Sequence, residues 1–175
     1  SIFSLPKIII KDKEVYEAFN FYRSMAWKVR GVDEPLNSLI KAGNTNLYSY
    51  RFDWDDQRKF LIANFKELFG ATHALEVPLL AGDSALVGGP PVSNFIYPRG
   101  ISRFYMSRNI MRFWANFAKT GFPGNSTNNI IWTPYVKEKS DKNFYMILDN
   151  KNNLKMSSDF LSLEALTEQL YVDKR

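Results

Sequence analysis

The chain has 175 residues, of which 45% are apolar and 15% aromatic; this length predicts one compact domain or a piece of a larger one, and this composition excludes a disordered chain. The net charge of +5 bears on solubility and selects no partner. With no cysteine and a single histidine, His73, the sequence excludes disulfides, a cysteine nucleophile and a structural zinc site.

The first part of the chain is predicted to form two helices and a strand. Apolar residues recur with helical spacing after Asp12, which is suited to cap a helix, and Gly31 is suited to end it. A shorter helix is expected over 34–43, with a proline in its first turn. Residues 45–52, rich in aromatic and β-branched side chains, predict a strand buried on both faces, and 54–63 a loop or short helix.

The second part is predicted to alternate loops and helices. The glycine- and proline-rich segment 82–100 indicates a long loop. Helical spacing over 107–121 predicts a helix capped by Ser107 and ended by Gly121. Strands at 143–149 and 154–157 predict a hairpin, and 157–171 a last amphipathic helix. The order of elements is that of a mixed α and β protein. The predicted apolar face of the 107–121 helix consists of Ile110, Met111, Trp114, Phe117 and Ala118.

Glycine spacing excludes several common sites from this sequence. No two of the nine glycines lie four apart, so the G-x-S-x-G nucleophile elbow is absent. None lie two or five apart, which excludes G-x-G-x-x-G and the phosphate-binding P-loop. The run beginning at Gly82 is similar to a G-D-S-L hydrolase motif, but its leucine is displaced by one position. Ser84 is therefore interpreted as a loop residue.

His73 is the main candidate for chemistry. A lone histidine near an apolar face is more often structural than catalytic. Gly70 nevertheless offers a tight turn beside it, Glu76 follows three residues later, and the loop comes after a predicted strand, where α/β proteins carry working residues. An imidazole placed there can act as a general base near neutral pH.

The segment around His73, FGATHALEVPLLAG, resembles the histidine motif of the type-B carboxylesterase and cholinesterase family, G-x-x-H-G-x-E/D followed by apolar residues. LYSYRFDW resembles the family's preceding strand, and IMRFWANFAKTGFPG its following helix. The tryptophan-proline turn at 132–135 and the late hairpin also match, so the resemblance covers roughly residues 45–160. One departure is Ala74, where the family pattern has glycine.

The resemblance implies an α/β-hydrolase fold and hydrolysis of a small carboxylic ester through a Ser, His and Glu/Asp triad, without cofactor or metal. It makes His73 the triad histidine and gives Glu76 a supporting, hydrogen-bonding role. In the family the serine, the triad acid and the oxyanion loop precede the histidine. Residues 1–175 are therefore expected to be the C-terminal segment of a single esterase domain, whose partner is the upstream portion. Alone, the segment is expected to be inactive.

Other interpretations stay open. A catalytically silent member of the same fold would serve as a binding or adhesion module. Residues 84–137 hold six basic and no acidic side chains among aromatics, as a groove for single-stranded nucleic acid would. Because Arg108 and Arg112 lie opposite Trp114, a solvated face is favoured and no nucleic acid is expected. A soluble chain, cytoplasmic or secreted and without a membrane span, is predicted, with an unpaired strand at 45–52 that favours a dimer.

Overall fold

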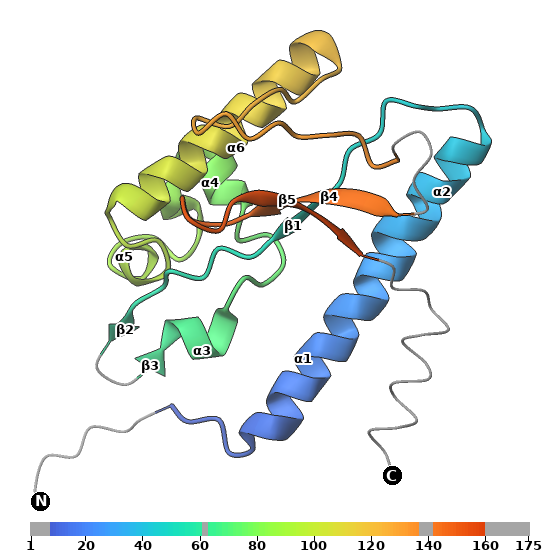
Figure 1. The fold of residues 1–175 in the computed structure, drawn as a ribbon. Coiled ribbons are helices and arrows are strands. Elements are labelled where there is room, and N and C mark those ends of the chain that lie inside the picture. The colour runs from blue at the N-terminus through green and yellow to red at the C-terminus, as the bar shows by residue number, and fades with distance from the viewer. Residues whose placement is uncertain (1–7, 61–62, 137–141, 160–175) are drawn as a thin grey trace, which may run out of the picture. The chain divides into compact units, whose positions relative to one another are not determined.

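The computed structural model describes residues 8–60, 63–136 and 142–159, which form mixed helices and strands (Figure 1). They divide into two compact units. One is built mainly from 50–133 and 145–157, the other from 10–49 and 134–144.

The second unit begins with an almost continuous helical segment. Helix α1 (Lys13–Lys28) passes through a π-helical turn (Val29–Asp33) into helix α2 (Glu34–Lys41). As predicted, Asp12 caps α1, and its carboxylate accepts a hydrogen bond from the backbone N–H of Val15 at 3.0 Å. The shorter helix expected over 34–43 is confirmed as α2.

Gly31 does not end the first helix, so that prediction is wrong. It lies inside the π-helical turn, and the helical backbone continues past it. A Cβ atom at this position would lie 2.9 Å from the Cδ1 atom of Trp27, closer than van der Waals contact allows. The glycine is thus explained by the space that the indole of Trp27 occupies.

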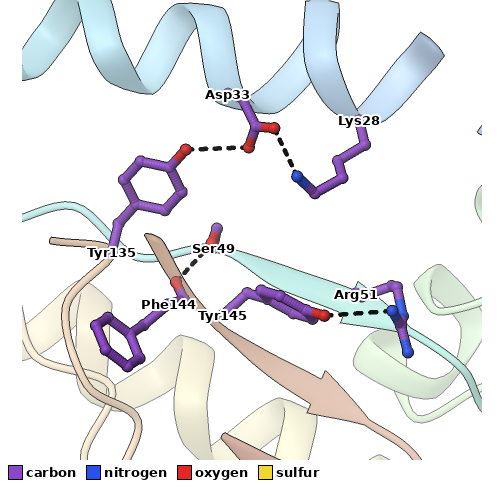
Figure 2. A network of polar contacts seen from close by, with 7 residues as sticks. All are labelled: Lys28, Asp33, Ser49, Arg51, Tyr135, Phe144 and Tyr145. Carbon is purple, nitrogen blue, oxygen red and sulfur yellow. Dashed lines mark hydrogen bonds and ion pairs between the residues drawn. The ribbon is translucent and has the colours of Figure 1, made fainter. Parts of the chain in front are cut away.

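A buried carboxylate organises this unit. Asp33, 9% exposed, accepts a hydrogen bond from the Tyr135 hydroxyl at 3.0 Å and pairs with the Lys28 ammonium at 2.6 Å (Figure 2). The Ser49 hydroxyl also donates to the carbonyl of Phe144 at 3.1 Å. Because a buried charge needs partners, these bonds fix the helical segment to the 134–144 segment of the same unit.

The first unit contains a three-stranded sheet in the order β1, β4, β5. Strand β1 (Tyr50–Phe52) runs parallel to β4 (Asn143–Leu148), with Tyr50 opposite Met146, and β4 neighbours β5 (Lys155–Asp159). The late hairpin is thereby confirmed.

The strand expected over 45–52 is confirmed only in its last three residues, and burial on both faces is wrong. Arg51 is exposed and its guanidinium pairs with the Asp53 carboxylate at 2.6 Å. The guanidinium also lies over the Tyr145 ring and donates a hydrogen bond to the Tyr145 hydroxyl at 3.3 Å (Figure 2). A charged side chain that covers an aromatic ring keeps this face of β1 in contact with water.

Short elements connect β1 to the long helix. The predicted loop over 82–100 contains a 3₁₀ turn and a helix, so the expectation of an irregular segment was wrong in part. The backbone N–H of Ser93 donates to the carbonyl of Gly89 at 2.9 Å, which lets a helical turn form between the glycines and Pro98. The elements are β2 (Lys59–Phe60), β3 (Ala63–Asn64), α3 (Phe65–Phe69), α4 (Val77–Ala81), the 3₁₀ turn Ser84–Leu86 and α5 (Val92–Ile96).

Helix α6 (Ile101–Thr120) begins earlier than predicted and ends at Gly121, as expected. Ser107 is therefore not a cap, and its hydroxyl donates to the carbonyl of Leu79 on α4 at 2.6 Å. The first turn of α6 is held instead by Ser102, whose hydroxyl accepts from the Trp54 indole at 2.9 Å and bonds to Asp56.

The buried face of α6 is rotated from the predicted one. Met111 and Phe117 are 40% and 44% exposed, while Trp114 lies half-buried, with its ring edge-on to that of Tyr50 at 5.1 Å. The shift follows from Asn109, a fully buried amide that exchanges two hydrogen bonds with Thr127. The buried residues of α6 are Tyr105, Met106, Asn109, Ile110 and Phe113.

The amphipathic helix predicted over 157–171 lies almost entirely outside the described residues. Among the helices that the structure describes, none is long and apolar enough to cross a membrane.

Candidate active site

The turn at 70–76, here called the His73 turn, connects α3 to α4 in the first unit. It opens at Gly70, whose backbone is left-handed at φ 52°, and presents His73 as an exposed side chain. Ala74 follows at φ 69°, a conformation that residues with a Cβ atom rarely adopt. The family pattern has glycine at this position, so the departure seen in the sequence coincides with a strained backbone.

Three side chains from outside the turn hold it in place. The Gln57 amide donates to the carbonyl of Gly70 at 2.7 Å. At the other end, the Tyr97 hydroxyl donates to the carbonyl of Leu75 at 3.0 Å, and the Tyr50 hydroxyl donates to the Glu76 carboxylate at 3.2 Å. Both ends of the segment that carries the imidazole are thus bonded to the body of the unit.

The tyrosine on the far side of the turn is itself rigidly packed. Tyr97 and Trp54 are both fully buried, and their rings stack with centroids 6.0 Å apart and planes 7° from parallel. The Trp54 indole donates to Ser102 at the start of α6. The position of the Tyr97 hydroxyl is therefore fixed by the helix and by the aromatic stack.

Electrostatics keeps both tyrosines protonated. Burial, with the charge of Glu76 and the hydrogen bond to it, raises the pKa of Tyr50 to about 12. Burial, with a smaller effect of Glu76, also raises the pKa of Tyr97. Both hydroxyls thus remain hydrogen-bond donors at neutral pH.

The structure places both candidates from the sequence on this one turn: His73 is exposed, and Glu76 is half-buried and bonded to Tyr50. Ser84 lies elsewhere, where its hydroxyl accepts from Arg103 at 3.3 Å.

Sequence reasoning missed the three side chains that anchor the turn. Tyr50 lies in the predicted strand and Tyr97 in the predicted loop, both without a distinguishing pattern. Gln57 stands in a polar run that gives no sign that its side chain is buried. A tyrosine or glutamine near a functional loop is a weak signal, because the partners of Gln57 and Tyr97 are backbone carbonyls that no sequence motif records, and the contact of Tyr50 with Glu76 arises only in the fold.

Within 8–60, 63–136 and 142–159, no group of three or more His, Asp or Glu side chains is placed to bind a metal ion.

Several solved esterases are similar to the chain. A PNB esterase is 27% identical at a TM-score of 0.41, over 70% of this chain and 20% of that one. Another structure of PNB esterase is 27% identical at 0.45, over 70% and 21%. A thermophilic PNB esterase is 21% identical at 0.45, over 94% and 35%. The chain thus spans between a fifth and about a third of these proteins.

No curated protein matches the chain. The family model described as Carboxylesterase family matches residues 13–164, which is most of the sequence. The α/β-hydrolase class expected from the histidine motif is confirmed, and the parallel pairing of β1 with β4 agrees with it. The chain belongs to the carboxylesterase family.

Proposed function

We propose that this chain supplies the catalytic histidine of a serine-dependent carboxylic ester hydrolase, with His73 as the proton shuttle. One observation carries the proposal. The histidine is exposed on a turn whose two ends are bonded to the body of the unit through Gln57, Tyr97 and Tyr50. Membership of the carboxylesterase family supports ester hydrolysis as the class of reaction.

In this mechanism the imidazole takes the proton from a serine hydroxyl as its oxygen attacks the ester carbonyl. The tetrahedral intermediate collapses to an acyl-serine, and the imidazolium returns the proton to the departing alcohol. Water then repeats the sequence: the imidazole takes a proton from water, the hydroxide attacks the acyl group, and the serine recovers its proton as the acid leaves.

The serine, the triad acid and the oxyanion donors come from polypeptide other than these 175 residues. The sequence contains no G-x-S-x-G, and in the family that it resembles the oxyanion loop precedes the histidine. We propose that residues 1–175 act as the C-terminal segment of one esterase domain and that the upstream portion is their partner. The apolar face of α1 supports this, because Val15 and Phe19 are 64% and 59% exposed and offer surface for further protein.

Glu76 has a supporting role in this proposal. Its carboxylate accepts the hydrogen bond of Tyr50, and its backbone carbonyl accepts the N–H of Leu80 in the first turn of α4 at 2.9 Å. It therefore joins the His73 turn to β1 and to α4. The triad acid is a separate residue from the upstream portion.

The experiment compares hydrolysis of a p-nitrophenyl ester by the full-length protein, by this chain alone and by two variants of the full-length protein. The full-length protein is expected to hydrolyse the ester, and the chain alone is expected to give no hydrolysis above that in buffer. His73→Ala is expected to lower kcat by several orders of magnitude. Thr72→Ala, at the exposed neighbouring position, is the matched control and is expected to stay within threefold.

Two results would contradict the proposal. Hydrolysis by the isolated chain would show that the serine and the oxyanion donors are not required from elsewhere. Full-length protein without esterase activity would favour a binding module that lacks catalysis.

A further inference from the structure

We propose that Tyr97 and Tyr50 are positioning residues for His73, which hold the turn so that the imidazole stays in its catalytic position. The inference rests on the proposed function of His73. It assigns a role in the reaction to two residues that lie far from the histidine in sequence.

Two backbone hydrogen bonds of the His73 turn lie at the long end of the usual range, at 3.3 Å from the N–H of Leu75 to the carbonyl of Thr72 and 3.2 Å from the N–H of Val77 to the carbonyl of Ala74. Ala74 is also in a conformation that a Cβ atom disfavours. A turn of this kind keeps its geometry only if the surrounding structure imposes it.

The two tyrosines impose that geometry at successive residues. Tyr97 bonds to the carbonyl of Leu75 and Tyr50 to the side chain of Glu76, which lie two and three residues after the histidine. They come from separate elements, the segment between α5 and α6 and the strand β1. Together they restrain the turn at two neighbouring points, so that it cannot pivot about a single bond.

Both hydroxyls are carried by rings that pack against other aromatic side chains. Tyr97 stacks on Trp54, as described above. Tyr50 packs edge-on against Trp114 at 5.1 Å and Trp132 at 6.2 Å. Replacing either tyrosine by phenylalanine keeps the ring and its packing and removes the hydroxyl alone.

The expected effect is on turnover. A displacement of about 1 Å in a catalytic group can cost about 100-fold in rate. Tyr97→Phe and Tyr50→Phe are therefore each expected to lower kcat by roughly 10-fold to 100-fold. KM should stay within threefold, because both hydroxyls are engaged in hydrogen bonds to the His73 turn.

The test uses the full-length protein that carries this chain. Tyr145→Phe is the matched control, since that tyrosine lies on the strand paired with β1 and its hydroxyl bonds to Arg51, away from the turn. For each variant kcat, KM and the melting temperature are measured. If Tyr97→Phe does not fold, Tyr50→Phe decides alone.

A fall in kcat with constant KM, absent in Tyr145→Phe, supports the inference. If both tyrosine variants fold and keep kcat within twofold of the control, the inference is overturned, and so it is if KM alone changes. His73→Ala in the same series separates the two proposals. If His73→Ala keeps its activity, the function of His73 itself is overturned. If His73→Ala loses its activity while the two tyrosine variants keep their kcat, only the positioning role of the tyrosines is overturned.

Discussion

Replacing Ala74 by glycine is expected to stabilise the protein. The backbone at φ 69° costs a residue with a Cβ atom about 1–2 kcal/mol. Glycine removes this cost but gives the unfolded chain more conformational freedom, which reduces the gain in the free energy of unfolding by about 0.4–1 kcal/mol. The Ala74 methyl group is exposed, so its loss removes little buried surface. The net gain is about 0.5–1 kcal/mol, or about 2 °C in melting temperature for a domain of this size.

The free energy of unfolding, measured in urea at an unchanged denaturant slope, checks this value. Asn129, at φ 62°, is the matched control. Asparagine tolerates the left-handed region, so Asn129→Gly should change the free energy by only a few tenths of a kcal/mol. If Ala74→Gly lowers stability, or gains no more than Asn129→Gly, the strain assigned to the His73 turn is refuted.

Three further changes test the remaining structure. Tyr135→Phe removes the buried hydrogen bond to Asp33 and is expected to cost about 2 kcal/mol in the free energy of unfolding; an unchanged value would show that the bond adds nothing. Burial raises the pKa of Asp149 above 3.8, so the charged form of this carboxyl group opposes folding. The Asp149→Asn variant should therefore be more stable than the parent at pH 7, and the difference in the free energy of unfolding should vanish below pH 3.8. The pKa of Tyr50 is raised to about 12, so the stability that its protonated hydroxyl adds to the fold is complete below pH 10 and is lost toward pH 12. Tyr50→Phe should therefore remove a phenol of pKa about 12 from the alkaline absorbance titration.

Predictions from sequence succeeded where one residue decides the backbone. Asp12 caps α1 through its own carboxylate, and Gly121 ends α6 in the left-handed conformation that glycine favours. The same reasoning wrongly predicted a helix end at Gly31, because the contact with Trp27, and not the backbone angle, accounts for the glycine at this position. Composition alone does not separate these two uses of glycine.

Tertiary contacts account for the other differences. The early start of α6 depends on Ser102, which is bonded to residues far back in the chain. The rotated face of the helix depends on Asn109, a polar residue that becomes buried because Thr127 satisfies its amide. Hydrophobic periodicity assigns such a residue to the surface.

The candidate site was predictable in part. The motif placed His73 and Glu76 on one turn, and the structure agrees. The anchors Gln57, Tyr50 and Tyr97 were not predictable, because each becomes a neighbour of the turn only through the fold.

The most direct test of His73 as the base is the rate of acylation in a single turnover. With full-length enzyme in excess over a p-nitrophenyl ester, the release of p-nitrophenolate reports the serine's attack without the later hydrolysis of the acyl-enzyme. His73→Ala is expected to slow this release by about 10⁴-fold to 10⁶-fold, with the melting temperature preserved. Release within tenfold of the parent rate would contradict the account.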